Sequence, residues 1–163
     1  MKAKYNSTGK SSKMENEFVK FLKSKGYNFD TQVSFKLQEG FVFEGERYLP
    51  ITYVADVYFP ESKIAMDFKG VITPLYKIKK KLFVSKYNQP LYEIKVAPKY
   101  VQNILGSPYI EEKSLSLIQK EKNKLNVKKL ELNTELAKVL VDKYTISKKY
   151  DIIFLKEKGG QKW

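Results

Sequence analysis

The sequence predicts an α/β fold in which helices flank a mixed sheet, with a helical extension at the C-terminal end. Three observations predict this class. The chain has 163 residues, of which 42% are hydrophobic and 14% aromatic, enough to bury one sizeable core. Along residues 13–106, segments with helical spacing of apolar residues are interspersed with alternating, strand-like segments. After Pro108 the chain turns to lysine-rich stretches with helical spacing.

The elements of the α/β part follow from local patterns. Residues 14–25 are expected to form a helix, because apolar residues recur at helical spacing, Ser12 can cap the start and Gly26 follows the end. A second helix is expected at 75–87, opened by Thr73 and Pro74. Strands are expected at 27–37, 48–59, 64–71 and 91–96, the middle two joined by a short turn and therefore antiparallel.

The C-terminal part is expected to hold a short helix at 100–105, a long one at 111–132 and two more at 134–143 and 147–155. The last two resemble a helix-turn-helix, although amphipathic helices that cover a sheet or a partner subunit show the same pattern. The expected organisation is a flexible basic arm at 1–12, a core at 13–106, and a helical module at 107–163 for DNA binding or dimerisation.

The charge indicates a polyanionic partner. Lysine and arginine number 31 against 18 acidic residues, a net charge of +13, and Arg47 is the single arginine. Nucleic acid is the natural partner for such a chain. A solvated tail and a solvated helix face are the alternatives for the lysines expected to contact DNA, which are Lys10, Lys13, Lys77, Lys79 and Lys81.

The absent residues exclude most catalytic chemistries. The chain has no cysteine and no histidine, which removes zinc fingers, Ser-His-Asp triads, redox thiols, haem and iron-sulfur centres. A site made of carboxylates favours Mg²⁺, with Mn²⁺ as a substitute. The chain also lacks the roughly 20 apolar residues of a membrane span and the apolar region of a secretory signal, so we expect a cytoplasmic protein without a membrane partner.

Asp67 and Lys69 are the first candidates for catalysis. They lie two residues apart on the third expected strand and project from one face, and Asp56 on the neighbouring strand can meet Asp67 across the ladder. Three other acid-x-lysine triplets exist, but this one alone combines a strand, an upstream aspartate and a following glycine. The alternative is that these acids are merely solvated or paired to lysines.

A further carboxylate is expected from the first helix, which offers Glu15 and Glu17. At 100° per residue, Glu15 lies about 50° from the centre of the apolar stripe and Glu17 about 110° away, on the other side. Glu15 is therefore expected at the edge of the buried face, looking toward the aspartates, and Glu17 in solvent.

Together Glu15, Ala55-Asp56 and Asp67-Phe68-Lys69 resemble the signature of the PD-(D/E)XK nucleases. The likeness covers about residues 12–96 and extends to small phage-borne endonucleases, including Holliday-junction resolvases, with Ala55 in place of the proline. It implies a restriction-endonuclease-like fold in which the three acids and the Phe68 carbonyl bind one or two Mg²⁺ ions and Lys69 supports the attacking water. Gln32 and Lys79 or Lys81 are similar to secondary positions of such enzymes. Gln32 is expected to contact DNA, with an ordinary strand-edge amide as the alternative.

The expected function is a Mg²⁺-dependent endodeoxyribonuclease that hydrolyses phosphodiester bonds in phage DNA metabolism, specific for branched DNA such as Holliday junctions. It would act as a homodimer in the host cytoplasm, without a small-molecule cofactor, because a resolvase cuts two strands symmetrically. A non-catalytic basic nucleic-acid-binding protein is the alternative. A structural phage component is a third possibility.

Overall fold

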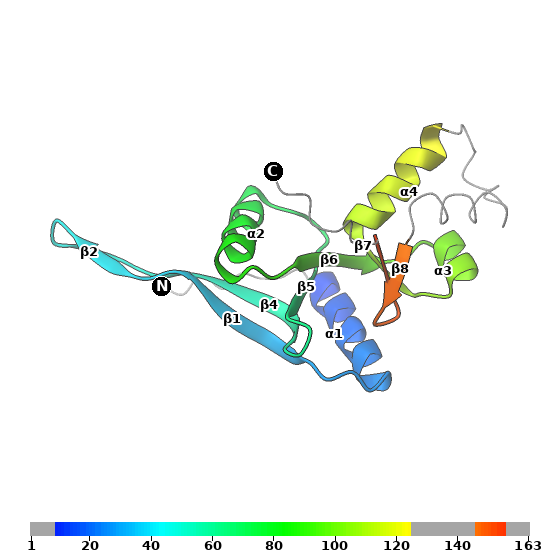
Figure 1. Ribbon diagram of the computed structural model, residues 1–163, viewed down its shortest axis with the longest axis horizontal. Helices are drawn as coiled ribbons and strands as arrows, with labels where there is room; N and C mark the ends of the chain where they lie inside the picture. The colour runs from blue at the N-terminus through cyan, green and yellow to red at the C-terminus, as the bar shows by residue number, and fades with distance from the viewer. Residues whose placement is uncertain (1–8, 125–145, 156–163) are drawn as a thin grey trace. The chain divides into compact units, whose positions relative to one another are not determined.

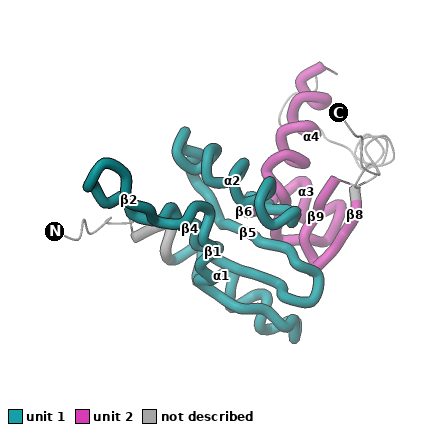
Figure 2. The backbone as a smooth tube through the Cα atoms, turned by 60° about the vertical axis from the view of Figure 1, so that its left-hand side comes forward, with its two compact units in different colours: residues 1–93 teal, residues 94–163 magenta. Residues whose placement is uncertain are grey.

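The computed structural model describes residues 9–124 and 146–155, and the chain forms two compact units, residues 1–93 and 94–163 (Figure 2). Hydrogen-bonded strands follow the order β1-β4-β5-β6-β7-β9-β8, with β2 and β3 paired separately. A mixed sheet with flanking helices and a helix near the C-terminal end confirms the expected fold class (Figure 1). In the described part of the chain, no helix is long and apolar enough to cross a membrane.

The first unit holds the elements expected from the sequence, with two additional short strands, β2 and β3. Its elements are α1 (Gly9–Ser24), β1 (Asp30–Gln38), β2 (Phe41–Phe43), β3 (Glu46–Tyr48), β4 (Ile51–Phe59), β5 (Ile64–Phe68), α2 (Pro74–Tyr87) and the first half of β6 (Leu91–Val96), a strand that the boundary between the units divides after Glu93. Strand β4 lies between β1 and β5 and is antiparallel to both. Helix α1 packs against β5, and α2 packs against β1 and β4.

The core of this unit forms between α2 and the sheet. Its buried members come from β1, β4, β5, α2 and β6, and they are Leu37, Tyr53, Ala55, Ala65, Tyr76, Phe83 and Leu91. Phe35 adds edge contacts with the rings of Phe83 and Tyr87, at centroid distances of 4.9 and 5.3 Å. On α1, Phe18 and Leu22 are fully buried, and the Phe18 ring lies 5.9 Å from that of Phe68. These contacts hold α1 and α2 against the central strands.

Helix α2 begins and ends as its sequence predicts. The Thr73 hydroxyl accepts a hydrogen bond from the Tyr76 backbone N–H at 3.1 Å, and Pro74 occupies the first turn, where its missing N–H costs nothing. Asn88 closes the helix in the left-handed conformation, with φ 52°. The five lysines of the helix are thereby carried on one well-capped element.

Several boundaries in this unit differ from expectation. Strand β1 begins at Asp30 and not at residue 27, and β5 ends at Phe68 and not at residue 71, so Lys69 lies just past the strand on which it was expected. Helix α1 begins at Gly9, so residues 9–12 belong to the helix and not to the flexible arm, and Ser12 is not its cap. The strand expected at 48–59 is interrupted at Leu49 and Pro50, and Tyr48 belongs to β3. Strands β2 and β3 form a hairpin, residues 39–50, that extends past the paired ends of β1 and β4 (Figure 1). The pattern of aromatic and β-branched residues continues across Pro50, which concealed this break.

The second unit contains α3 (Lys99–Leu105), β7 (Tyr109–Glu111), α4 (Glu112–Lys124), β8 (Ile146–Lys149) and β9 (Ile152–Leu155). Strand β9 pairs in parallel with β7 and antiparallel with β8. Its core contains Ala97, Val101, Ile110, Ile118 and Ile153. The expected helices at 100–105 and 111–132 are confirmed over the residues that the structure describes.

The helix expected at 147–155 is wrong, because these residues form the β8–β9 hairpin. Tyr150 and Asp151 both have positive φ, 54° and 56°, the backbone of a tight hairpin turn. The following Ile152, Ile153 and Phe154 are all buried, which suits a strand covered on both faces. The second half of the expected helix-turn-helix is therefore absent, and its first half, 134–143, lies outside the described residues.

Candidate active site

Asp56 on β4 and Asp67 on β5 meet where the ladder between these strands ends. The register runs from Phe59↔Ile64 to Val57↔Met66, so the two aspartates occupy the next pair of positions. There the backbone donates to side chains: the Asp56 N–H to Asp67 Oδ1 and the Phe68 N–H to Asp56 Oδ2, each at 3.0 Å. The pairing expected from the sequence is thus present, and each carboxylate satisfies a backbone group of the opposite strand.

Gln32 connects Glu15 of α1 to this pair. Its side-chain amide donates from Nε2 to Glu15 Oε1 at 2.9 Å and, more weakly, to Asp56 Oδ1 at 3.5 Å. The register on either side, Thr31↔Val57 and Val33↔Ala55, places Gln32 directly opposite Asp56. The three acids from three elements therefore share one neighbourhood, and a neutral amide stands between the first and the second.

The backbone at Gln32 is unusual. Its φ of 53° is left-handed inside a strand, where a residue with a Cβ pays roughly 1–2 kcal/mol. Glycine would adopt this conformation without that cost. The conformation accompanies the bridge that the Gln32 side chain makes to the two carboxylates.

Tyr53 fixes Asp67 from the interior. Its hydroxyl donates to Asp67 Oδ2 at 2.6 Å, and both side chains are buried, at 3% and 0% exposure. Burial and the adjacent Asp67 raise the pKa of Tyr53, so it stays a neutral donor. With Tyr53 on one oxygen and the Asp56 N–H on the other, the Asp67 carboxylate has a defined orientation.

The two aspartates hold protons more tightly than ordinary acids. Burial, and next the charge of Glu15, raise the pKa of Asp56 from 3.8 to about 6. Burial and the charge of Asp56 likewise raise the pKa of Asp67 from 3.8 to about 6. The backbone and side-chain donors and Lys69 act in the opposite direction but do not offset burial. The site is thus short of positive charge for the acids that it holds.

Lys69 follows β5 directly and lies near both aspartates, whose pKa values its charge lowers. Its Nζ lies 4.8 Å from the centre of the Tyr76 ring, a cation-π contact that holds the ammonium group at the site. The Tyr76 hydroxyl is buried, and it has no hydrogen-bond partner in the described part of the chain. Burial, then the charges of Asp67 and Glu93, raise the pKa of Tyr76.

A partly buried ion pair lies on the neighbouring elements. Lys80 of α2 donates to both carboxylate oxygens of Glu93 on β6, at 2.7 and 2.8 Å, and Glu93 is 7% exposed. Both oxygens are engaged by one ammonium group, which compensates the buried charge. Glu93 contributes a negative charge close to Tyr76 but is already neutralised by Lys80.

The structure distributes the expected site residues as follows. Glu15, half-buried, and Glu17, exposed, lie as expected, and Glu15 joins Asp56, Asp67 and Lys69. Gln32, which is expected to contact DNA, is hydrogen-bonded to two acids. Lys13 is exposed on α1, and the side chain of Lys10 lies outside the described residues. Lys77 and Lys81 are exposed and Lys79 is half-buried, all on α2. Phe68 contributes its N–H to Asp56, and its ring is buried.

The carboxylate oxygens of the site are the kind of ligand that a hard divalent cation prefers. Asp56 and Asp67 offer adjacent oxygens, and their raised pKa values signal unrelieved negative charge, which a cation would stabilise. No group of three or more acidic side chains in the described ranges is arranged to hold a metal ion as it stands. Glu15 is separated from Asp56 by the Gln32 amide. A cation at the aspartates would thus gain Glu15 as a ligand only when that amide moves.

Sequence reasoning missed Tyr53, Tyr76 and the Lys80–Glu93 pair. Tyr53 lies three positions before Asp56, and strict strand alternation places it on the opposite face. The left-handed Gln32 opposite Asp56 interrupts the regular ladder, so alternation fails across this point. Glu93 stands in a triplet with Lys95, but its partner is Lys80, one turn of α2 after Tyr76. The sequence signal for the last two was the four-residue spacing of Tyr76 and Lys80, which places both on one side of α2.

Comparison with known proteins gives a family and no activity. No curated protein and no solved structure matches the chain significantly. A family model described as "Protein of unknown function (DUF1064)" matches residues 2–102, which include every residue of the site described above. The chain therefore belongs to the DUF1064 family.

Proposed function

We propose that this protein is a metal-dependent endodeoxyribonuclease of the PD-(D/E)XK type, which hydrolyses phosphodiester bonds in branched DNA. The observation that carries the proposal is the pair of adjacent aspartates, Asp56 and Asp67, with Lys69 beside them and Glu15 joined to them through Gln32. A net charge of +13 supports a polyanionic substrate. Without histidine or cysteine, oxygen ligands are the means by which this chain can bind a catalytic metal.

Each residue has a distinct task in this proposal. Asp56 and Asp67 would hold Mg²⁺ or Mn²⁺, and Glu15 would join them. The bound cation would supply Lewis acidity and neutralise charge on the phosphate. Lys69, held over the Tyr76 ring, would orient the attacking water and stabilise the developing negative charge. Tyr53 keeps the Asp67 carboxylate in one orientation through its short hydrogen bond.

The lysines outside the site favour recognition of DNA shape over sequence. Lysine binds a phosphate as a mobile point charge and lacks the planar fork with which arginine reads guanine. The exposed Lys13 on α1 and Lys77 on α2 are the phosphate contacts that we propose in the first unit. A substrate with an unusual backbone path, such as a four-way junction, suits such a set of contacts.

Cleavage of labelled DNA tests the proposal. The full chain is incubated with linear and four-way DNA of the same sequence, with Mg²⁺ and with a chelator. We expect cutting of the junction that requires Mg²⁺ and is lost in Asp67→Ala. Glu61→Gln is the matched control, because Glu61 and Lys63 form the same triplet in an exposed turn, and it should cut normally.

A non-catalytic DNA-binding protein is the competing function, and the high positive charge supports it. The two differ in the response to Asp67→Ala. For a nuclease this change abolishes cleavage and preserves or tightens DNA binding, because a negative charge facing the phosphate is removed. Binding with no cutting of any DNA form, in Mg²⁺ or in Mn²⁺, would favour the binding protein.

A further inference from the structure

The β2–β3 hairpin, residues 39–50, exposes apolar side chains on both of its faces. Paired residues of an antiparallel ladder project from the same face, and the pairs here are Phe41↔Tyr48, Val42↔Arg47 and Phe43↔Glu46. The three aromatic rings therefore share one face, and Val42 and Arg47 occupy the other. The exposed apolar side chains are Phe41 at 46%, Val42 at 69%, Phe43 at 59%, Tyr48 at 40% and Leu49 at 70%. One flat partner surface would leave one face bare, so this distribution suits insertion between two surfaces.

The hairpin has a defined geometry. Glu44 and Gly45 both have positive φ, 48° and 77°, the backbone of a tight two-residue turn. At the neck, a Cβ on Gly40 would lie 3.1 Å from the Pro50 side chain and from the Tyr48 carbonyl oxygen, so the strands approach closely there. A ribbon that is ordered in advance loses less conformational entropy on insertion than a flexible loop would.

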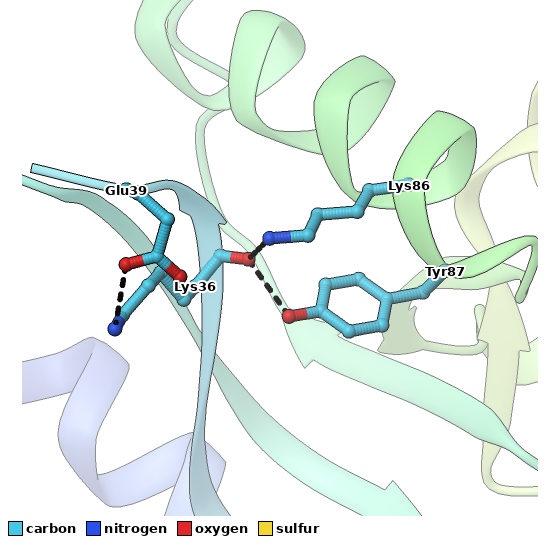
Figure 3. Close-up of polar contacts among 4 residues, drawn as sticks. All are labelled: Lys36, Glu39, Lys86 and Tyr87. Atoms are coloured by element: carbon cyan, nitrogen blue, oxygen red, sulfur yellow. Dashed lines mark hydrogen bonds and ion pairs between the residues drawn. The ribbon is translucent and has the colours of Figure 1, made fainter.

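The base of the hairpin is fastened to α2 (Figure 3). A register shift between Lys36 and Gln38 marks the end of the β1–β4 ladder. The Lys36 carbonyl accepts hydrogen bonds from Lys86 Nζ at 2.8 Å and from the Tyr87 hydroxyl at 2.7 Å, and the Lys36 ammonium pairs with Glu39 at 3.1 Å. These bonds hold the base of the hairpin against the unit that carries the aspartates.

The aromatic face is suited to a planar ligand. The rings of Phe41 and Tyr48 are nearly parallel, at an interplanar angle of 10° and a centroid distance of 4.8 Å. They border a hollow of about 240 Å³ that Arg47 and Pro50 also line. This volume is below the roughly 300–1,000 Å³ of sites for drug-sized ligands, and it suits one planar ring system. An unstacked nucleobase is such a ligand, and it stacks on aromatic side chains whatever its sequence.

The charges of the hairpin favour contact with bases over contact with the phosphate backbone. The hairpin holds three glutamates and one arginine, in a chain whose net charge is +13. Glu46 accepts a hydrogen bond from the Tyr48 hydroxyl at 3.2 Å on the aromatic face, and Arg47 is exposed on the other. Arg47 is the single arginine among 31 basic residues, and its planar fork can bond the edge of a base or stack on it, which lysine cannot do. Bases are accessible to such groups where a duplex is unstacked.

The hairpin continues the strand pair that carries the acids. Between the aspartates and the neck, the β1–β4 ladder exposes Ser34, Lys36 and Val54. Asp56 lies five residues from Ile51, the first residue of β4, which corresponds to about 17 Å along the strand. About five base pairs of a duplex have this length. One bound DNA arm can therefore reach both the acids and the hairpin.

We infer that the hairpin inserts at the branch point of a DNA substrate, where unstacked bases lie against its two faces. The inference rests on the proposed function and adds the feature of the substrate that is recognised. The aromatic face stacks on an exposed base, while Val42, Leu49 and Arg47 face the bases of the neighbouring arm. The interior of a linear duplex offers no unstacked base, so the hairpin contributes to the binding of branched DNA alone.

Fluorescence anisotropy in Ca²⁺, with a four-way junction and a linear duplex of the same sequence, tests the inference without cleavage. Wild type should bind the junction more tightly. Phe41→Ser with Tyr48→Ser should weaken junction binding about tenfold and leave duplex binding within about twofold. Arg47→Lys and Leu49→Ser, which leave the ring stack intact, should each weaken junction binding a few-fold. Val96→Ser is the matched control, because Val96 is 46% exposed on β6, outside the hairpin and the site, and it should bind as wild type does.

Photocrosslinking identifies the contact. A junction with 5-iodouracil at the branch point should crosslink to residues 39–50, as located by mass spectrometry, and the same base in the middle of an arm should not. A junction preference that persists in all hairpin variants, or branch-point crosslinks confined to other residues, would overturn the inference and leave the proposed nuclease intact. Equal losses for junction and duplex, or a wild type without preference for the junction, would also overturn it. A wild type that binds neither DNA would overturn the inference and the proposed function together.

Discussion

The two ends of the β1–β4 pair distribute their side chains in opposite ways. At one end, Gln32 and Asp56 lie beside the buried Asp67, so charge is placed where apolar groups are usual. At the other end, the hairpin of residues 39–50 places five apolar side chains in solvent. The carboxylates at one end are short of compensating positive charge, and the apolar side chains at the other end are exposed in the described structure.

The comparison also shows which interactions offset each deficit within the chain. At the site, a tyrosine, a glutamine amide and two backbone N–H groups compensate the carboxylates. At the hairpin, the hydrogen bonds to the Lys36 carbonyl hold only the base in place, and the apolar side chains beyond it stay exposed. The carboxylates of the site are therefore held in place by contacts within the chain, whereas the apolar side chains of the hairpin are not covered in the described structure.

The largest expected effect is that of Asp67→Asn on cleavage. The amide removes one charge; its single oxygen can accept from the Asp56 N–H while its NH2 group donates to the Tyr53 hydroxyl oxygen, so the fold should remain. We expect cleavage to fall on the order of 10²-fold or more, with DNA affinity unchanged or higher. Rates measured under single-turnover conditions, with binding measured in Ca²⁺, separate the two. Cleavage by the variant at the wild-type rate would remove Asp67 from the active site.

The second effect concerns pH and the stability of the metal-free protein. The pKa values of Asp56 and Asp67, both about 6 against 3.8 in an ordinary aspartate, mean that the folded protein binds more protons than the unfolded chain between about pH 4 and 6. The free energy of unfolding should therefore decrease as pH rises through this window. Urea unfolding across the window, with wild type and Asp67→Asn in parallel, measures it. If the stability of Asp67→Asn depended on pH as steeply as that of wild type, the raised pKa of Asp67 would be contradicted.

A smaller effect separates the two properties of Gln32. Alanine and glycine both remove the amide that bridges Glu15 and Asp56, but glycine alone accepts φ 53° without strain. Without cation, Gln32→Gly should be about 1 kcal/mol more stable than Gln32→Ala. Both should gain more from added Mn²⁺ than wild type gains, since the amide no longer separates the acids. Thermal unfolding with and without Mn²⁺ tests this, and equal stability of the two variants would remove the strain argument.

The smallest effect is expected from the exposed lysines of the first unit. Lys13→Ala with Lys77→Ala should weaken binding to four-way DNA a few-fold and reduce the slope of log affinity against log salt by about 2. The loss should be uniform across DNA sequences, because each lysine contributes only charge. Fluorescence anisotropy over a salt series measures both quantities. A loss confined to one DNA sequence would indicate base recognition instead.

Regular elements of the first unit could be predicted because local chemistry and tertiary structure agree there. Helix α2 has its Thr73 cap, its Pro74 and its apolar spacing, and β5 follows a short turn from β4. The C-terminal hairpin could not be predicted, because Ile152, Ile153 and Phe154 are compatible with a buried helix or a buried strand, and pairing with β7 selects the strand. Nonlocal pairing of this kind is not visible in a single sequence.

The candidate site was predictable in its acids and not in its supports. Asp56, Asp67, Lys69 and Glu15 stand at spacings that a strand pair and a helix edge bring together. The bridge by Gln32 depends on a left-handed backbone, which propensity places elsewhere. The contact of Tyr53 with Asp67 depends on the irregular ladder opposite that residue. The supporting contacts depend on departures from ideal strand geometry, and a regular pattern of apolar and polar residues does not predict such departures.

The binding of Mn²⁺ to the full chain tests the central claim most directly. Calorimetric titration at a pH well above the pKa values of both aspartates, with wild type, Asp67→Asn and the control Glu61→Gln, measures cation binding without DNA or catalysis. The proposed site predicts saturable binding by wild type and by the control, and its loss in Asp67→Asn. Binding that is absent from wild type, or undiminished in Asp67→Asn, would contradict a cation site at Glu15, Asp56 and Asp67.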